Sequence, residues 1–378
     1  MLDTVILLLN NFMFTIIEPN KFSPPLEGWK EYNPSGFKKY INNPTPFDKK
    51  NDIYKPRLTA IKRGASLDLK IEFSAPKLLN KNNVDELTDE DFPKILNKLQ
   101  RDLKEMGIGV FTNFLENANV LSFHPSKNIL LKNGMTSSYI IKEFKKIDLN
   151  KNFDITEAQF RNNGQSIQHY SISSSFVMYD KVADLNKSQK RAIDKEQTKT
   201  QIDIFNILNK KEDKNIEILR FELRLSGKKK MNQVLKNLGY QENPKFKDIF
   251  KKEVCKSILK SYLNNIIAGN LFIFDLTTNK QKILSTIILK QDKKKFKQAL
   301  YLYALLDLCK DEDGVTGLRS ITESLIKNIN WSKIKKDLQE LNKLDFVKKP
   351  DYINEINKQI EEFKPLHIYD EIKPKEPP

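Results

Sequence analysis

Cysteine, which forms disulfides, is scarce in this sequence of 378 residues, and so is histidine, which with cysteine supplies the ligands of many metal sites. Cys255 and Cys309 are the only cysteines, and they do not form a CxxC pair. This argues against a disulfide framework or a structural zinc site, fits a reducing cytoplasm, and predicts that both cysteines lie in helix cores. The three histidines, His124, His169 and His367, are isolated from one another, so there is no His-x-His pair.

Motifs for nucleotide and hydrolase chemistry are also missing. The sequence has no G-x-x-x-x-G-K-S/T phosphate loop, no G-x-G-x-x-G turn and no G-x-S-x-G elbow. We therefore expect no nucleotide cofactor, and neither dinucleotide redox chemistry nor serine hydrolysis has an anchor in this chain.

Long hydrophobic runs are absent as well. The most apolar segment, residues 5–17, is interrupted by Asn10 and Asn11. It falls short of the roughly 20 apolar residues that a membrane-spanning helix needs, and it lacks the basic leader and cleavage site of a signal peptide. We predict a buried strand or hairpin there, and a soluble protein without membrane association.

What the sequence has in excess is positive charge. Its formal net charge is +16 and its pI is near 9.4. A basic protein suits a polyanionic partner such as nucleic acid, because binding phosphates releases their counterions. Heavy use of lysine, asparagine and isoleucine can also reflect an AT-rich genome, so charge alone does not identify the partner.

Hydrophobic periodicity predicts an α+β domain over residues 1–227. Residues 67–73 alternate apolar and polar side chains, which specifies a strand with one buried face. Thr88 and Asp91 form a capping-box start to a helix that ends near Gly107. Further strands are predicted at 120–123, 168–172, 176–179 and 216–225, and helices at 136–146 and 188–208. The irregular order favours an antiparallel sheet with helices on one face.

The rest of the chain has little strand character. Residues 20–57 lack periodicity and are predicted to be a long surface connection. From residue 228, amphipathic patterns predict an all-α domain over 228–363 that binds DNA or serves as an accessory. Its lysine runs at 228–230 and 293–295 suit either DNA backbone or solvated helix faces. The proline-containing tail, 364–378, is predicted to be disordered.

The strand at 217–225 is the most informative segment. Leucine and phenylalanine side chains share one face, while Arg220, Glu222 and Arg224 share the other. One interpretation is structural, with ion pairs between strands on a half-exposed face. The other is functional: Glu222 would ligate Mg²⁺ or Mn²⁺, and both arginines would hold phosphate oxygens.

A possible partner for this strand is Tyr179, near the end of the strand at 176–179. Strand alternation would place Lys181 on the same face. A phenol has a pKa of about 10, so a nucleophilic tyrosine needs a neighbouring cation or base, which Lys181 could supply. The alternative is an ordinary packed tyrosine with its hydroxyl bonded to a neighbour.

Two histidines could complete a metal site with Glu222. His124 follows the strand at 120–123, and His169 lies in the strand at 168–172. A lone histidine is more often structural than a ligand, but strands could bring both toward Glu222. The expected site would then mix imidazole and carboxylate, and His367, near the tail, is a poor candidate.

Four segments in this order resemble replication initiators of filamentous phages, the gene II type of phage and plasmid replication protein. The resemblance runs from the N-terminal segment that begins at Asp3 through the C-terminal helices. It is most specific at Leu69–Leu79, Val120–Ile129, Phe176–Leu185 and Ile218–Leu225. The family nucleophile falls on Tyr179, with the lysine two residues later at Lys181, and Arg220 and Glu222 match the family's Arg-Phe-Glu strand.

This resemblance implies a degenerate Rep/HUH-like nickase that starts rolling-circle replication. It would cut one strand of a double-stranded origin, form a 5′-phosphotyrosine, and later rejoin displaced single strands with Mg²⁺ or Mn²⁺. The family carries aspartate where this chain has His124, and both side chains can ligate a cation. A host helicase is an implied partner, since this chain has no motor motif.

Two other functions fit the same features. A non-catalytic origin-binding or single-strand-binding protein would use basic helices and exposed aromatics without Tyr179 or a metal. A tyrosine transposase or relaxase would use similar chemistry on another biological substrate. An origin-like hairpin beside the gene would favour replication, and terminal repeats around the gene would favour transposition.

Overall fold

A computed structural model of the chain describes residues 1–26, 37–131, 135–147, 157–161, 165–185, 198–210, 216–269, 280–290, 295–310, 314–326, 329–342 and 351–372. It has an α+β fold with a large antiparallel sheet, as predicted. The chain divides into two compact units: a first unit of Met1–Leu130, Ile172–Leu259 and Glu362–Pro378, and a second of Leu131–Ser171 and Lys260–Glu361. The first unit continues past residue 227, so the units do not follow the predicted domains. The predicted division by function stays a prediction.

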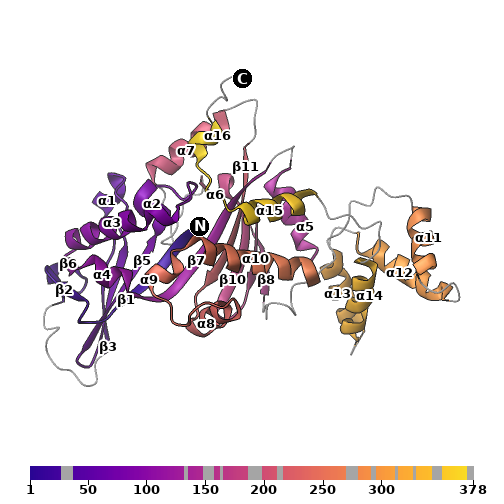
Figure 1. Cartoon of the computed structure of the whole chain (residues 1–378), viewed down its shortest axis with the longest axis horizontal. Coiled ribbons are helices and arrows are strands. Elements are labelled where there is room, and N and C mark those ends of the chain that lie inside the picture. The colour runs from indigo at the N-terminus through magenta and orange to yellow at the C-terminus, as the bar shows by residue number, and fades with distance from the viewer. Residues whose placement is uncertain are drawn as a thin grey trace. The chain divides into compact units, whose positions relative to one another are not determined.

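The first unit is built on a sheet whose strands follow the order β3-β4-β5-β1-β7-β11-β10 (Figure 1). The pairs β3–β4, β4–β5, β5–β1, β1–β7 and β10–β11 are antiparallel. The strands are β1 (Leu2–Leu9), β3 (Phe37–Asn42), β4 (Arg57–Arg63), β5 (Ser66–Ser74), β7 (Asn119–Leu131), β10 (Ser174–Asp180) and β11 (Glu217–Leu225).

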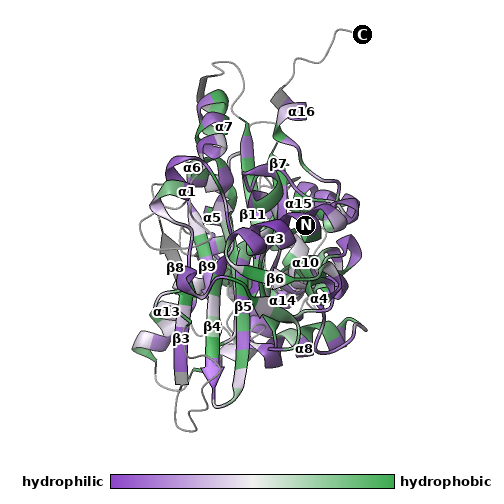
Figure 2. Ribbon diagram, turned by 90° about the vertical axis from the view of Figure 1, so that its left-hand side faces the viewer, coloured by the Kyte–Doolittle hydropathy of each residue, from purple (hydrophilic) through white to green (hydrophobic). Residues whose placement is uncertain are grey.

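Alternation of side chains builds the core of this sheet, as the period of two predicted. Along β5, Leu67, Leu69, Ile71 and Phe73 are buried, and the residues between them are partly exposed. Figure 2 shows the same alternation of hydrophobic and hydrophilic residues along β4 and β5. Because a one-residue slip would turn the apolar set toward water, this pattern specifies the register of the pairing.

The N-terminal apolar segment forms two strands in different sheets. β1 pairs with β5 and β7, whereas β2 (Phe14–Ile16) pairs with β6 (Ile108–Val110) in a separate two-stranded sheet. The strand prediction is therefore confirmed, and the hairpin alternative is wrong.

Gly107 has φ +83°, and a Cβ there would lie 2.9 Å from the Glu18 carbonyl oxygen. Both features require glycine where β6 follows helix α3.

Helices cover the first unit, and α2 packs against β1 and β5 (Figure 1). The predicted capping box is present: the Thr88 backbone N–H donates to Asp91 Oδ2 at 2.9 Å. Residues 20–57 contain β3 and α1, so their prediction as an irregular connection is wrong in part. The helices are α1 (Pro46–Lys50), α2 (Ala75–Asn80), α3 (Phe92–Glu105), α4 (Thr112–Glu116), α6 (Lys181–Leu185), α7 (Lys199–Lys210), α8 (Lys228–Asn237), α9 (Phe246–Ile249) and α16 (Ile368–Ile372), with 3₁₀ turns η1 (Pro19–Lys21) and η2 (Asp89–Asp91).

The second unit has a helical core of its own, in which α11, α12, α13 and α14 pack around Trp331. The predicted helix at 136–146 is confirmed as α5. From Lys228 on, the named elements are all helices, as predicted. Both cysteines are buried, Cys255 within α10 and Cys309 as the C-cap residue of α12. The elements of the unit are α5 (Ser137–Lys145), β8 (Glu157–Arg161), β9 (Ser166–Tyr170), α11 (Lys280–Lys290), α12 (Phe296–Leu308), α13 (Gly314–Leu325), α14 (Trp331–Asn342) and α15 (Asp351–Glu362), and α10 (Lys252–Gly269) runs from the first unit into the second.

Two expectations fall partly outside these ranges. Lys293 and Lys294 of the second lysine run, and residues 188–197 of the helix predicted at 188–208, are not among the described residues. Within the part of the chain that is described, no helix combines the length and hydropathy that a membrane span requires.

The predicted disorder of the tail is wrong for residues 364–372. Leu366 and Ile368 are buried in a cluster with Val84 and Leu185. The backbone N–H of Ile368 also donates to Asp85 Oδ1 at 2.8 Å. The sequence misled because its prolines and charges suggest a solvated segment, whereas apolar side chains between them supply a packed anchor. Residues 373–378 lie outside the described residues.

We expect Ile368→Ala to destabilise the protein by about 2–5 kcal/mol, because it removes a fully buried aliphatic side chain. Urea unfolding measured by circular dichroism would show the loss. Tyr369→Ala is the matched control, because Tyr369 is exposed beside it, and it should shift the unfolding midpoint little. Equal midpoints for wild type and Ile368→Ala would contradict the anchored tail.

Candidate active site

The pairing of β10 with β11 gathers the predicted site residues on one face of the sheet. Tyr179 lies opposite Arg220, and Val177 lies opposite Glu222. Opposed residues in an antiparallel pair point to the same face, so Tyr179, Arg220 and Glu222 share it. On the other face, the Phe176 and Phe221 rings pack with centroids 4.8 Å apart. The alternation that the sequence predicted for the strand at 217–225 is therefore confirmed.

The neighbouring strands β7 and β1 add polar groups to this face. His124, Ser126 and Asn128 follow one another at every second position of β7, so the strand's period of two directs them to the same side. Asp3 near the start of β1 is buried, and its carboxylate accepts a hydrogen bond from the Ser74 hydroxyl at 2.8 Å. Three adjacent strands, β1, β7 and β11, thus meet in one polar cluster.

Arg220 lies at the centre of this cluster and is fully buried. Its guanidinium forms an ion pair with Asp3 at 2.7 Å. It also donates to Ser126 Oγ at 2.9 Å, to the Asn83 carbonyl oxygen at 3.0 Å and to Asn128 Oδ1 at 3.1 Å. In this arrangement the two terminal nitrogens of the guanidinium donate to groups of the protein itself. The phosphate role of Arg220 stays a prediction.

Glu222 is also buried, yet it is surrounded by cations. Arg224 Nε lies 2.7 Å from Oε1, Arg220 Nε 3.4 Å from Oε2, and His124 Nδ1 3.6 Å from Oε1. Burial alone would raise the pKa of Glu222, but Arg224, Arg220 and His124 outweigh it and hold that pKa well below its usual range. Glu222 is therefore ionised at neutral pH and is a weak base as long as these cations remain.

Tyr179 donates its hydroxyl hydrogen to Glu222 Oε2 at 3.3 Å, and its side chain is half-buried. Burial, and then the charge of Glu222, raise the pKa of Tyr179 well above 10, although Arg220 acts in the opposite direction. The phenol is therefore protonated at neutral pH. A nucleophilic role requires that its proton be accepted by a base, and Glu222 is the group in contact with it.

Lys181 is placed differently from the prediction. It begins helix α6 instead of continuing the strand, and its Nζ lies 5.5 Å from the centroid of the Tyr179 ring. It is therefore a cation on the ring face, not a partner of the hydroxyl. Its side chain is fully buried, with Asp184 Oδ2 at 3.7 Å. Burial lowers the pKa of Lys181 to about 8.

Several members of the cluster were not predicted from the sequence. One is Glu86, whose carboxylate accepts a hydrogen bond from the backbone N–H of Asn128 at 2.6 Å and forms an ion pair with Lys127. Asn83 supplies a carbonyl to Arg220. The one signal available was Asp3, a carboxylate at the entrance of an apolar strand. The others come from loops and a strand whose spatial proximity no sequence pattern gives.

The two remaining histidines are not part of this cluster as described. His169 lies on β9 in the second unit, and burial lowers its pKa to about 4. Its predicted role as a metal ligand therefore stays a prediction. His367 lies in the tail of the first unit, where its carbonyl accepts from Asp370 N at 3.1 Å.

As arranged, this donor set does not form a metal site. Glu222 and His124 bring one carboxylate and one imidazole together, but Arg224 and Arg220 already occupy the carboxylate. Among the described residues, no group of three or more histidine, cysteine, aspartate or glutamate side chains could hold a metal ion. We derive no chemical step through a metal, and the predicted Mg²⁺ or Mn²⁺ requirement stays a prediction.

Comparisons with protein-family models, with curated proteins and with solved structures find no match for this chain.

We expect Arg220→Met to destabilise the fold by about 3–5 kcal/mol, because it leaves the buried carboxylates of Asp3 and Glu222 without their shared cation. Chemical unfolding would measure the change. Lys94→Met removes an exposed ion pair with Asp91 and should change stability little. An Arg220→Met protein as stable as wild type would show that this cluster does not depend on Arg220.

Lys181 should make stability depend on pH between about 8 and about 10.5, its folded and ordinary pKa values. In that window the unfolded chain retains a proton that the folded protein has lost, so wild-type stability rises with pH. Lys181→Met lacks this burial cost and should gain up to about 3 kcal/mol over wild type below pH 8.

Unfolding curves at several pH values should show the gain of Lys181→Met shrinking as the pH rises. Lys251→Met, at an exposed position, is the control and should show no such dependence. A pH-independent difference between Lys181→Met and wild type would contradict the lowered pKa.

Proposed function

We propose that this protein is a DNA nicking and joining enzyme that starts rolling-circle replication, with Tyr179 as its nucleophile. The observation that carries the proposal is the contact of the Tyr179 hydroxyl with Glu222, at 3.3 Å, on a strand pair beside the partly exposed Arg224. A tyrosine with a carboxylate on its hydroxyl and a cation beside it has the parts of an activated nucleophile.

The reaction is an exchange of one phosphodiester for another. The Tyr179 oxygen forms a bond to phosphorus while its proton passes to Glu222. The bond from phosphorus to the 3′ oxygen of the DNA breaks, and that oxygen takes up a proton from water. The 5′-phosphotyrosine retains the phosphodiester, so the reverse transfer to a 3′-hydroxyl rejoins the strand without ATP.

Arg224 offers a way for substrate to activate the base. Its side chain is about one quarter exposed, and its Nε lies 2.7 Å from Glu222. A phosphate that binds the Arg224 guanidinium would draw it from Glu222, since guanidinium groups match phosphate oxygens well. The pKa of Glu222 would then rise, and the carboxylate would become a stronger base when DNA is bound.

The proposal includes the wider expectations of the sequence resemblance. These are a degenerate Rep/HUH-like nicking domain, double-stranded and single-stranded origin DNA as substrate, Mg²⁺ or Mn²⁺ as cofactor, a cytoplasmic location and a host helicase as partner. The net charge of +16 supports a DNA partner. An origin-binding protein without activity, and a transposase or relaxase, are the alternatives that the experiment must separate.

We expect wild-type protein to nick supercoiled circular DNA of its own replicon in the presence of Mn²⁺ or Mg²⁺ and to form a covalent adduct. Tyr179→Phe should lose both products, because it removes the attacking oxygen and leaves the ring. Gel electrophoresis of the DNA, and of protein labelled by its DNA adduct, would measure the two products.

Tyr369→Phe is the matched control, since Tyr369 is exposed and lies away from the strands that carry the site. It should nick as wild type does. Binding of origin DNA without cleavage or adduct by wild type would favour the origin-binding alternative. Equal nicking by Tyr179→Phe would place the nucleophile elsewhere, and activity on DNA ends with terminal repeats instead of the origin would favour transposition.

A further inference from the structure

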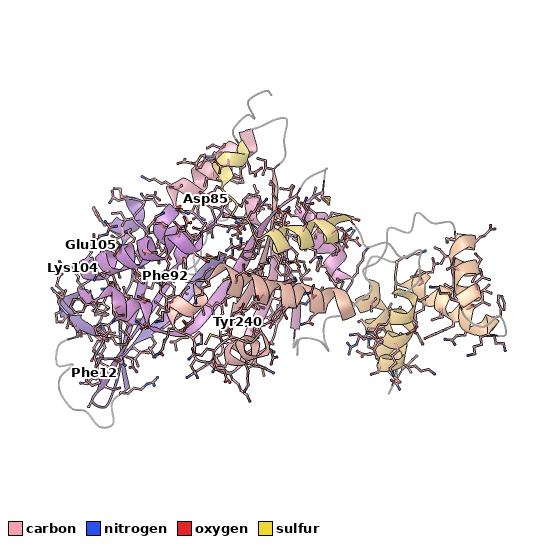
Figure 3. All side chains as sticks on the ribbon, in the orientation of Figure 1. Phe12, Asp85, Phe92, Lys104, Glu105 and Tyr240 are labelled. Atoms are coloured by element: carbon pink, nitrogen blue, oxygen red, sulfur yellow. The ribbon has the colours of Figure 1, made fainter. Side chains whose placement is uncertain are left out.

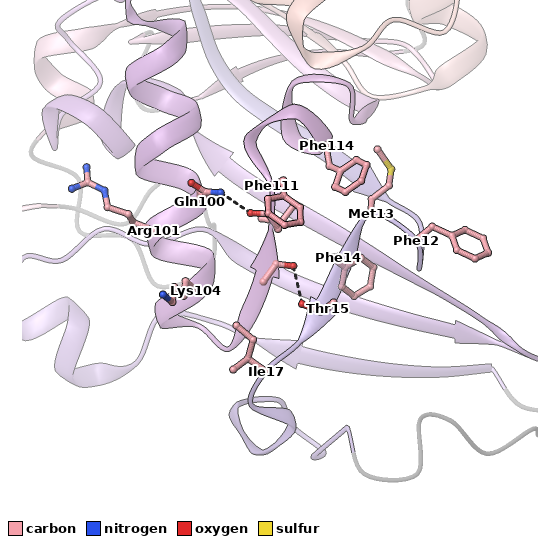
Figure 4. Close-up of a pocket in the computed structure, with 12 residues that line it drawn as sticks. Phe12, Met13, Phe14, Thr15, Ile17, Gln100, Arg101, Lys104, Phe111 and Phe114 are labelled. Atoms are coloured by element: carbon pink, nitrogen blue, oxygen red, sulfur yellow. Dashed lines mark hydrogen bonds between the residues drawn. The ribbon is translucent and has the colours of Figure 1, made fainter.

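A second feature of the first unit lies away from Tyr179, where β2 and β6 meet helices α3 and α4. There the protein surrounds a cavity of about 530 Å³ (Figure 4). The side chains that line it are mainly apolar and aromatic. They include Phe12, Met13, Phe14, Ile17, Phe111 and Phe114.

Two of these aromatic side chains are unusually open to solvent. Phe12 is 84% exposed and Phe111 is 73% exposed. The backbone at both positions is fixed by local contacts. The Phe12 N–H donates to Asn10 Oδ1 at 3.2 Å, and Phe111 is the N-cap residue of helix α4. The ring centroids of Phe111 and Phe114 lie 6.2 Å apart. Exposed aromatic rings on a held backbone are surfaces on which a flat ligand can stack.

The rim of the cavity is positively charged. Arg101 and Lys104 are exposed residues one turn apart on helix α3, and both line the cavity. Among the described residues, neither side chain has a hydrogen-bond or ion-pair partner. The lining includes no carboxylate. In the view of Figure 3, Phe12 and Lys104 both lie at the outer edge of the first unit. The cavity therefore offers aromatic rings with two available cations.

The walls of the cavity are joined to one another. Gln100 Nε2 donates to the Val110 carbonyl oxygen at 2.8 Å, which ties α3 to β6, and Thr15 Oγ1 donates to the Gly109 carbonyl oxygen at 3.4 Å (Figure 4). A Cβ at Gly109 would lie 2.5 Å from Thr15 Oγ1, so glycine permits the close approach of the two strands. The site is formed before a ligand arrives.

We propose that this cavity binds unpaired bases of single-stranded DNA, with Phe12 and Phe111 stacking on bases and Arg101 and Lys104 contacting the backbone phosphates. Interleaved aromatics and cations are what sequence-tolerant single-strand binding needs, because every base has a stacking face and every linkage a negative charge. An apolar peptide would use the rings but would leave both cations without partners. Which single-stranded DNA the protein meets rests on the proposed function, whereas the chemistry by which the cavity binds it does not.

The test is fluorescence anisotropy of a short labelled oligothymidylate with the full-length protein, in buffer without divalent metal ions. Phe12→Ala and Phe111→Ala should each weaken binding at least about fivefold, the lower end of the range for one lost base stack. Ile172→Ala is the matched control, because Ile172 is 96% exposed and does not line the cavity. It should bind as wild type does.

Charge reversal tests the second half of the site. Arg101→Glu and Lys104→Glu should weaken binding and lower its dependence on salt, because each removes a phosphate contact and its released counterion. Lys251→Glu makes the same charge change at an exposed position outside the cavity and should have the smaller effect. Circular dichroism would confirm that each variant is folded.

Wild-type affinity in both phenylalanine variants would overturn the inference. So would equal losses in Lys251→Glu and the two cavity charge variants, which would show that net charge alone binds the DNA. Binding of a hydrophobic fluorescent dye would be measured in parallel. If the phenylalanine variants bind the dye less than wild type but bind oligothymidylate equally well, the cavity binds an apolar protein segment instead.

The two proposals can fail separately. If wild type never nicks its replicon but the phenylalanine variants lose oligothymidylate binding, the single-strand site stands and the nickase does not. If wild type nicks and the variants bind normally, the nickase stands and this site does not.

Discussion

The buried guanidinium of Arg220 is the group on which the polar face of the sheet depends. It joins Asp3 of β1, Ser126 and Asn128 of β7 and the carbonyl of Asn83 around a single charge on β11. Burying a guanidinium and two carboxylates has a large desolvation cost, which only close pairing and complete hydrogen bonding offset. These contacts join the polar face of β11 to those of β1 and β7.

The same charges set the chemistry available at Tyr179. Burial and Glu222 keep the phenol protonated, while Arg224 and Arg220 keep Glu222 ionised but weakly basic. In this state Tyr179 does not readily lose its proton and Glu222 does not readily accept one. Arg224 is the most exposed of the cations in contact with Glu222. In the proposed reaction, phosphate binding at Arg224 would be what makes Glu222 more basic.

Strand patterns in the sequence predicted much of this arrangement and missed what depends on long-range proximity. The alternation of Arg220, Glu222 and Arg224 against leucines and Phe221 predicted both faces of β11, because a period of two is local information. Lys181 was misplaced because nothing local indicated that the strand ends at Asp180. The ion pair of Arg220 with Asp3 and its hydrogen bonds to Asn83 and Asn128 could not be predicted, since these partners lie far from it along the chain. The packing of residues 364–372 was missed because the burial of Leu366 and Ile368 depends on residues far away in the sequence, such as Val84 and Leu185.

The contact of Leu366 with Glu86 has a consequence for the order in which the protein assembles. The Leu366 N–H donates to Glu86 Oε2 at 3.0 Å, Glu86 accepts from Asn128, and Asn128 accepts from Arg220. This relay begins with a residue that leaves the ribosome long after the strands it supports. A chain that lacks residue 366 lacks this donor to Glu86, although Lys127 still pairs with the same carboxylate oxygen. The chain of hydrogen bonds from Leu366 through Glu86 and Asn128 to Arg220 is therefore complete only in a protein that has been synthesised past residue 366.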